Sequence, residues 1–229
     1  MDYKVAHTDV NLFQLADSSF PIGGFVYSLG MESAIKHGVL KNNDDVLRYL
    51  KTYLNQIFSF DFPFFDAGYT YLNQPDEWDK ISIMYDVMLN NPSIYKSSIV
   101  LGKNWMKLVI SLYRSEKLSE LDNHFKQNKL PFHQVVLLGL GYAALGVNPT
   151  AMKEMYIYTA MRDQISALTR LGTIGPQGGQ SLLTVLLQEG NSKLKSYEPT
   201  HYEQATKSAY LLEILQLNHD KIYSKLFQN

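Results

Sequence analysis

The sequence predicts an all-α protein, folded as a single compact multi-helix domain of about eight to ten helices. Three observations favour this class. Apolar residues recur at helical spacing, helix-start signals precede those stretches, and no segment keeps the strict alternation of a strand. We therefore expect one domain over residues 1–229, with a candidate flexible tail near 218–229.

Two amphipathic helices are expected in the first half of the chain. Apolar residues in 46–57 recur at i, i+4, i+7 and i+11, with Asn43 as the expected cap and two aspartates behind it. A longer apolar face covers 94–112 and starts after Pro92. Small residues on this face, such as Ser98, favour close approach of a neighbouring backbone.

The aromatic run at 58–65 is the nearest approach to a strand. Phe58, Phe60 and Phe62 alternate, but Pro63 follows at once and the aromatic residues continue beyond it. We interpret the run as a kinked junction between two helices, packed in the core. Trp105, Tyr156 and Tyr158 are also expected to be core aromatics.

The second half carries further helix-start signals. Asn148–Pro149 reads as a cap followed by proline in the first turn, so a helix is expected from Ala151 to about Leu171. Thr200 and Glu203 have the spacing of a capping box, which predicts a last helix from there to Leu215.

Composition excludes several classes of protein. The formal net charge is −1, from 21 basic and 22 acidic residues, so no basic excess indicates nucleic-acid binding. The absence of cysteine excludes disulfides and thiolate chemistry and fits a reducing cytoplasm. The longest apolar run, 135–147, is shorter than the ~20 residues of a membrane span, and no targeting signal is visible, so a soluble cytoplasmic protein is expected.

The sequence also lacks the signatures of intrinsic catalysis. The six histidines include no pair at i, i+3 or i+4 that would offer a metal site on one helix. His37 is expected at a helix end, and His133 as a buried polar residue in preference to a metal ligand. Residues 175–181 are glycine-rich, but they lack the Gly-Lys-Ser/Thr ending of a phosphate loop.

Two segments are more particular than generic helix. Residues 12–32 read LFQLADSSFPIGGFVYSLGME, and residues 166–180 read SALTRLGTIGPQGGQ. The first closely resembles the N-terminal signature of the urease accessory protein F family, in which an L-Q-L-A-D-S helix precedes a P-I-G-x-F loop, a Y-S-x-G turn and a glutamate. The second resembles that family's A-A-x-R-L-x-P-L-G-Q-x-x-G-Q stretch. We call them the first and second signature segments.

Intermediate positions follow the same family order. Residues 130–146 are similar to its H-P-V-x-x-G…A-x-x-G helix, and Ser98 with Gly102 fits its serine–glycine helix. Two departures stand out: the proline of the second signature segment lies after Gly175 instead of before it, and histidine–proline is replaced by a segment containing His133.

The resemblance implies an all-helical, dimer-forming cytoplasmic protein that is not itself an enzyme. Family members join urease accessory protein D (also called H) and the GTPase urease accessory protein G, engage apo-urease, and promote activation of its dinuclear nickel site. Nickel and GTP are then handled by partner proteins, and this chain is expected to bind no cofactor.

The resemblance also implies where partners bind. No catalytic, cofactor-binding or metal-binding residue is expected, and the candidate partner-binding positions are Pro21, Gly23, Gly24, Tyr27, Ser28, Glu32, Arg170, Gly175, Gln177, Gly179 and Gln180.

Each prominent candidate has a structural alternative. The turn at 21–24 can be a simple helix connection, with Gly24 expected to tolerate a β-branched residue poorly if its φ is positive. Glu32 can be a solvated surface charge. Arg170 can stabilise a helix C-terminus, organise the following loop or contact an acidic partner, and an arginine finger towards a GTPase is a weaker option.

A different class of function remains as the alternative. In it, the chain is a helical small-molecule-binding protein or enzyme whose glycine-rich loops hold an anionic ligand at a helix N-terminus.

Overall fold

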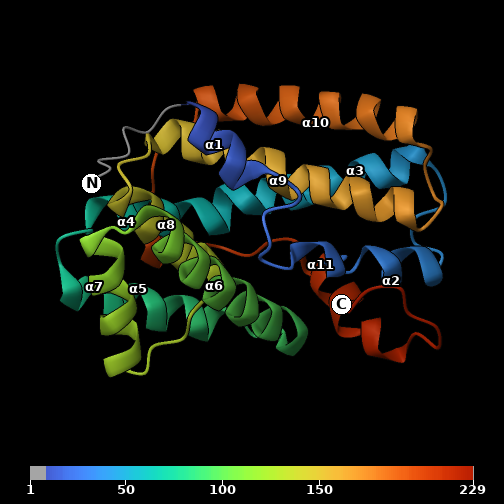
Figure 1. Ribbon diagram of the computed structural model, residues 1–229. Helices are drawn as coiled ribbons and strands as arrows, with labels where there is room; N and C mark the ends of the chain where they lie inside the picture. The colour runs from blue at the N-terminus through green and yellow to red at the C-terminus, as the bar shows by residue number, and fades with distance from the viewer. Residues whose placement is uncertain (1–8, 229) are drawn as a thin grey trace.

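The computed structural model describes residues 9–228, which form eleven α-helices and no strand (Figure 1). The predicted all-α class is confirmed. The helices are α1 Asp9–Ala16, α2 Met31–Lys36, α3 Asn43–Gln56, α4 Phe62–Thr70, α5 Pro75–Met88, α6 Pro92–Tyr113, α7 Glu116–Gln127, α8 Gln134–Ala144, α9 Pro149–Arg170, α10 Pro176–Lys195 and α11 Tyr210–Leu217.

Shorter helical pieces join these helices. Three-residue 3₁₀ turns occur at Gly24–Val26, Tyr202–Gln204 and His219–Lys221, and a π-helical turn, Ile57–Asp61, links α3 to α4. The aromatic run at 58–65 therefore continues the helix through a widened turn instead of breaking it. Phe62, Phe64 and Phe65 are fully buried, as expected for core aromatics.

Side-chain caps start the longer helices close to the expected positions. The Asn42 side chain accepts from the Asp45 N–H at 2.9 Å, so the cap of α3 lies one residue before Asn43. The Asn148 side chain accepts from the N–H groups of Thr150 and Ala151 at the start of α9. These bonds satisfy amide donors that a helix leaves unpaired at its first turn.

The predicted capping box at Thr200 is wrong. Residues 202–204 form only one turn, and α11 begins at Tyr210. The intervening chain hydrogen-bonds across the fold instead: Thr206 N–H donates to the Ser59 carbonyl at 2.8 Å, and the Ser59 hydroxyl donates to the Thr206 carbonyl at 2.9 Å. Because these tertiary bonds occupy the backbone groups, the helix is delayed until Tyr210.

The centre of the core is the contact between α4 and α8. A Cβ on Gly68 would lie 2.5 Å from the carbonyl carbon of Gly139, so the two backbones touch where both side chains are absent. Gly102 on α6 makes a similar approach to the Phe132 carbonyl oxygen, at 2.0 Å from a built Cβ. This agrees with the close approach expected along that helix.

α9 and α10 form an antiparallel hairpin on one side of the molecule, with α3 beside it (Figure 1). Trp105 is buried and Tyr156 is half-buried. Tyr158 is 39% exposed beside Arg162, so the prediction that it belongs to the core is wrong. Among residues 9–228, no helix combines the length and apolar character needed to cross a bilayer.

Candidate functional site

Glu32 of the first signature segment lies inside the protein. It is 1% exposed and sits in the first turn of α2, where a carboxylate is favourable. Its oxygens accept from the N–H groups of Leu226 and Phe227, at 2.7 and 3.1 Å, and lie 3.1 Å from His219 Nε2. The solvated-charge interpretation of Glu32 is therefore wrong.

These contacts also explain the titration of Glu32. Burial alone would raise the pKa of the carboxyl group, but the hydrogen bonds from the two backbone amides and from His219 together lower it below its ordinary value. Glu32 is consequently an ionised internal acceptor that holds the chain near its C-terminus against α2.

Arg170 contacts the same region from the other signature segment. It is the last residue of α9, and its Nη1 donates to the Phe25 carbonyl. The guanidinium carbon lies 4.4 Å from the centre of the Phe227 ring and 5.4 Å from that of Phe25. Arg170 thus contacts the loop of the first signature segment, not the loop that follows it in sequence, and it also packs on the C-terminal segment.

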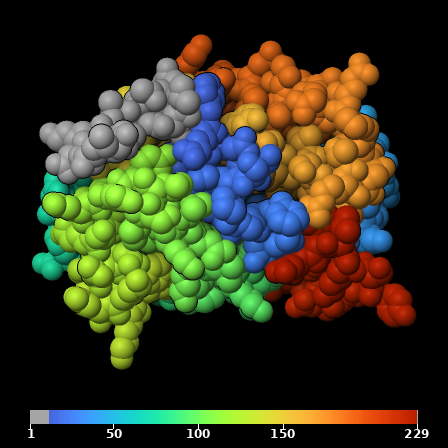
Figure 2. All heavy atoms as spheres, in the orientation of Figure 1, coloured from blue at the N-terminus to red at the C-terminus, as the bar shows by residue number. Residues whose placement is uncertain are grey.

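We name the group of Phe25, Glu32, Arg170, His219 and Phe227 the C-terminal clamp. A backbone hydrogen bond also joins the segments that carry Phe25 and Phe227, because the N–H of Gln228 donates to the Val26 carbonyl at 2.8 Å. Figure 2 shows the C-terminal segment (red) lying against the N-terminal part of the chain (blue). The two signature segments, far apart in sequence, therefore converge on the C-terminal segment. Within the candidate tail near 218–229, His219, Ile222 and Phe227 are buried, whereas Tyr223 is fully exposed.

The loop of the first signature segment precedes the clamp. Pro21 is exposed, and Gly23 has φ +90°, a conformation that disfavours any residue with a Cβ. Gly24 lies within a 3₁₀ turn and is not among the positive-φ residues, so the condition set for its intolerance of a β-branched residue is met at Gly23 and not at Gly24. Ser28 is fully buried, and its hydroxyl accepts from the Glu32 N–H at 3.4 Å.

The second signature segment divides into packing and surface positions. Gly179 is buried, and a Cβ there would lie 2.9 Å from the Ile165 side chain, so it allows α10 to pack on α9. Gly175, Gln177 and Gln180 are exposed around the start of α10, a few residues after Arg170. Of the candidate partner-binding positions, Pro21, Arg170, Gly175, Gln177 and Gln180 are therefore the exposed ones.

The two histidines discussed in the sequence analysis occupy structural positions. His133 is fully buried, with Nδ1 3.1 Å from the Ser98 hydroxyl and Nε2 3.0 Å from an Asp86 oxygen. Burial lowers its pKa, and Asp86 opposes that shift only in part. This confirms the expected buried polar role, and His37 is confirmed as the C-terminal cap of α2.

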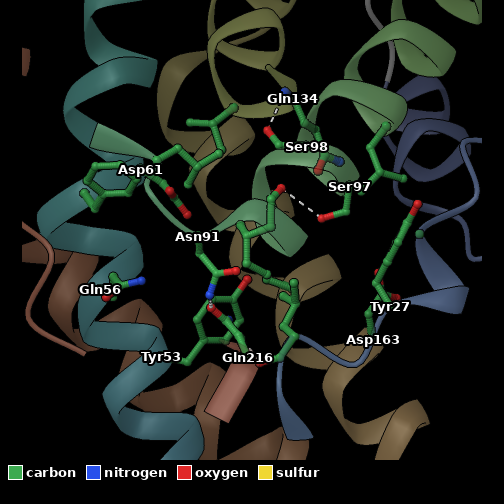
Figure 3. Close-up of a pocket in the computed structure, with 18 of the residues that line it drawn as sticks. Tyr27, Tyr53, Gln56, Asp61, Asn91, Ser97, Ser98, Gln134, Asp163 and Gln216 are labelled. Atoms are coloured by element: carbon green, nitrogen blue, oxygen red, sulfur yellow. Dashed lines mark hydrogen bonds between the residues drawn. The ribbon is translucent and has the colours of Figure 1, made fainter. Parts of the chain in front are cut away.

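A polar cavity of ≈160 Å³ lies behind the first signature loop, and we call it the central cavity (Figure 3). Its walls come from α3, the π turn, the start of α6, α9 and α11. Gly24 and Tyr27 bring the first signature segment to the same space. Burial raises the pKa of Tyr27, so this phenol stays neutral and can act as a hydrogen-bond donor.

Three carboxyl groups line the central cavity, and one of them, Glu213, forms an ion pair with Lys207. Asp61 is 8% exposed and accepts from the Tyr156 hydroxyl at 2.9 Å. Burial raises its pKa to about 7, although Tyr156 and Lys207 act in the opposite direction. Burial likewise raises the pKa of Asp163, against the neighbouring Arg162 guanidinium at 2.7 Å.

Sequence reasoning missed these acidic residues and His219. The position of Asp61 inside the aromatic run 58–65 was a visible signal, because a carboxyl group is rarely buried among phenylalanines unless it has a partner. Asp163 and His219 gave no local signal. Within residues 9–228, no group of three or more His, Asp or Glu side chains is arranged to hold a metal ion.

Comparisons with known proteins give matches over more than half of the chain. A model of the family described as UreF matches residues 40–187, which include the second signature segment. Urease accessory protein F from Oryza sativa subsp. indica is 28% identical over 225 residues, covering 96% of this chain and 85% of the relative. Urease accessory protein F from Arabidopsis thaliana is 26% identical over 219 residues, covering 94% and 90%.

Proposed function

Because the chain belongs to the UreF family, we propose that it is a urease maturation factor that works as a scaffold and regulator. UreF proteins are accessory proteins and not catalytic enzymes, so the chain's contribution is to the maturation of urease and not to its reaction. In the proposal it joins urease accessory proteins D (H) and G in the cytoplasm and promotes GTP-dependent nickel insertion into apo-urease.

The observation that carries the proposal is the convergence of both signature segments on the C-terminal clamp. A clamp that joins backbone amides and two aromatic rings orders the surface at one end of the α9–α10 hairpin. Phe25, 65% exposed, stands at its edge, and Gln177 and Gln180 are exposed near the start of α10. An aromatic side chain held on a rigid loop is typical of the residues that contribute most to protein interfaces.

The residues of the chain support a proposal in which partner proteins bind GTP and nickel. Its glycine-rich loop lacks the lysine and hydroxyl of a phosphate loop, so in this proposal the G protein binds GTP. Nickel is likewise the partners' cargo. The proposed homodimer draws on α11, where Tyr210, Leu211, Ile214 and Leu217 are 51–70% exposed. An exposed apolar face of this kind marks an interaction surface.

The test compares two variants of similar exposure that lie on different elements. Phe25→Ala alters the clamp edge, whereas Val87→Ala alters α5, where the side chain is 64% exposed. Tagged accessory proteins D (H) and G are used to capture each variant, and urease activity is measured in nickel-supplied cells that lack the native chain. We expect Phe25→Ala to weaken capture at least about tenfold, as loss of a central aromatic contact can, and Val87→Ala to match the native chain.

Two results would count against the proposal. Equal capture of both variants would remove the clamp edge as the partner surface. Full urease activation in cells without the chain, together with no capture by either accessory protein, would remove the maturation function itself.

A further inference from the structure

Polar and acidic side chains line much of the central cavity. Figure 3 shows Asp61 and Asp163 on different sides of the space, which Tyr53, Gln56 and Asn91 also line. Tyr53 is close enough to both carboxyl groups that each contributes to the raised pKa of its phenol. The two acids therefore act on one shared space and not on separate surroundings.

The charges facing this space do not cancel. Lys207 is the cation nearest to Asp61, but its ammonium group forms an ion pair with Glu213. Arg162 forms an ion pair with Asp163, and both residues line a second cavity of ≈270 Å³ that adjoins the central cavity through shared residues. Asp61 has a neutral hydrogen-bond donor, Tyr156, as its direct partner. The cavity thus has an excess of negative charge.

An unused hydrogen-bond acceptor lies in the same wall. Gln164 is 2% exposed on α9, and its Oε1 has no hydrogen-bond partner among residues 9–228. Buried amide oxygens are nearly always paired, so one that faces a cavity needs a donor inside that cavity. Water or a bound molecule with N–H groups would meet this need.

We propose that the central cavity is a binding site for a small organic cation that carries several N–H donors, of the guanidinium or amidinium class. Such a cation supplies a charge for Asp61 and Asp163 and a donor for the Gln164 oxygen. The size also fits, since a cavity of about 150 Å³ can hold a ring of six carbon atoms. A flat guanidinium group can in addition lie against the aromatic wall of Phe60 and Tyr85.

Other ligand classes fit the cavity less well. An anion, the ligand of the alternative function, would meet three carboxyl groups, and Lys207, the cation among the residues that line the cavity, is already paired with one of them. A tightly held metal ion would need more ligands than the described residues gather anywhere, since none of them form a group of three His, Asp or Glu.

The site predicts a dependence on pH. Asp61 is faced by Tyr53, Tyr85 and Tyr156, whose pKa values are raised by burial so that they stay neutral, and by Lys207, which pairs with Glu213. A cation binds best to the ionised carboxylate. Affinity is therefore expected to rise as pH increases through about 7, the pKa of Asp61 in the free protein.

The experiment titrates the full chain with methylguanidinium chloride at constant ionic strength, followed by calorimetry and by amide chemical shifts. Urea, sodium acetate and magnesium chloride are titrated in parallel as a neutral analogue, an anion and a divalent cation. Asp163→Asn removes one cavity charge, and Asp44→Asn removes one exposed charge at the start of α3 as the matched control. Melting curves confirm that each variant is folded.

We expect saturable binding of methylguanidinium with a Kd of about 1 mM or lower at pH 8. Asp163→Asn should weaken it at least about tenfold, in line with the loss of a charged partner, and Asp44→Asn should leave it unchanged. Lowering the pH to 6 should weaken binding to the native chain but not to folded Asp61→Asn. No saturation at about 20 mM, an equal response to urea or to magnesium, or undiminished binding by Asp163→Asn would each overturn the proposal.

Discussion

Removing the Glu32 carboxylate is the most direct test of the C-terminal clamp. In Glu32→Ala, the amides of Leu226 and Phe227 and the Nε2 of His219 lose their shared acceptor in a site that is 1% exposed. A hydrogen bond to a charged group contributes about 1.5–3 kcal/mol, and each buried donor left without an acceptor costs about 1–3 kcal/mol. The three bonds share one carboxylate, so their contributions do not add.

We therefore expect Glu32→Ala to lower the free energy of unfolding by about 3–5 kcal/mol. For a chain of this length, each kcal/mol shifts Tm by about 2–4 °C, so the melting temperature should fall by about 6–20 °C. The loss of unfolding free energy should not exceed this range, because residues 219–228 can detach from α2 while the rest of the fold persists. Hydrogen exchange at Leu226 and Phe227 would report that local detachment.

The measurement is urea unfolding of Glu32→Ala beside Lys36→Ala, an exposed position on the same helix. The effect should depend on pH. Because the pKa of Glu32 is lowered by folding, its contribution is present above the ordinary pKa of 4.5 and is lost as pH falls through the lower folded value. A change within about 0.5 kcal/mol for Glu32→Ala at pH 7, the range of an ordinary surface substitution, would refute the clamp.

Three further predictions concern packing, titration and assembly. Gly68→Ala should destabilise the protein by about 1–3 kcal/mol or more, because the new Cβ meets the Gly139 backbone at 2.5 Å, whereas Gly175→Ala, with no atom within 4 Å, should be close to neutral in urea unfolding. Asp61→Asn should unfold at higher urea than the native chain at pH 8 and show little difference near pH 4. The pKa of Asp61 is about 7 in the folded protein against an ordinary 3.8, so the native chain loses roughly 4 kcal/mol of folding stability as pH rises between these two values. An equal gain in stability of Asp61→Asn at both pH values would contradict this. Light scattering should give about twice the 26.2 kDa chain mass. Leu211→Ser on the exposed face of α11 should shift the measured mass towards that of the monomer. A native chain that stays monomeric at tens of micromolar while still binding partners would exclude a functional dimer.

The parts of the fold that were predictable are those specified by neighbouring residues. α3 and α9 each combine an asparagine cap with apolar spacing, and both signals act within a few residues of the helix start. The capping box at Thr200 carried the same local signal and still failed, because the Ser59 backbone, far away in sequence, hydrogen-bonds to Thr206. A local pattern cannot reveal a competing partner that only the tertiary fold supplies.

The candidate site shows the same limit. The resemblance drew attention to Glu32 and Arg170, but their burial and partners depend on residues 219–228, at the other end of the chain. A carboxylate in the first turn of a helix looks identical in sequence whether it meets water or two buried amides. Asp61 was the exception, since its place inside an aromatic run indicated a buried acid that needs a partner.

The clamp and the central cavity are connected by the first signature segment. Tyr27 lines the cavity only two residues after Phe25, which packs against Arg170. The Leu29 carbonyl accepts from Tyr49 at 3.1 Å and from Gln216 at 3.1 Å, and Gln216 lines the cavity from α11. Because one short segment contacts both places, it cannot shift at the clamp without moving part of the cavity wall. The buried signature residues therefore maintain internal geometry, and the exposed ones at the edge of the clamp remain for recognition of a partner. A partner that displaces Phe25 would also alter the position of Tyr27 and, through it, the polar cavity.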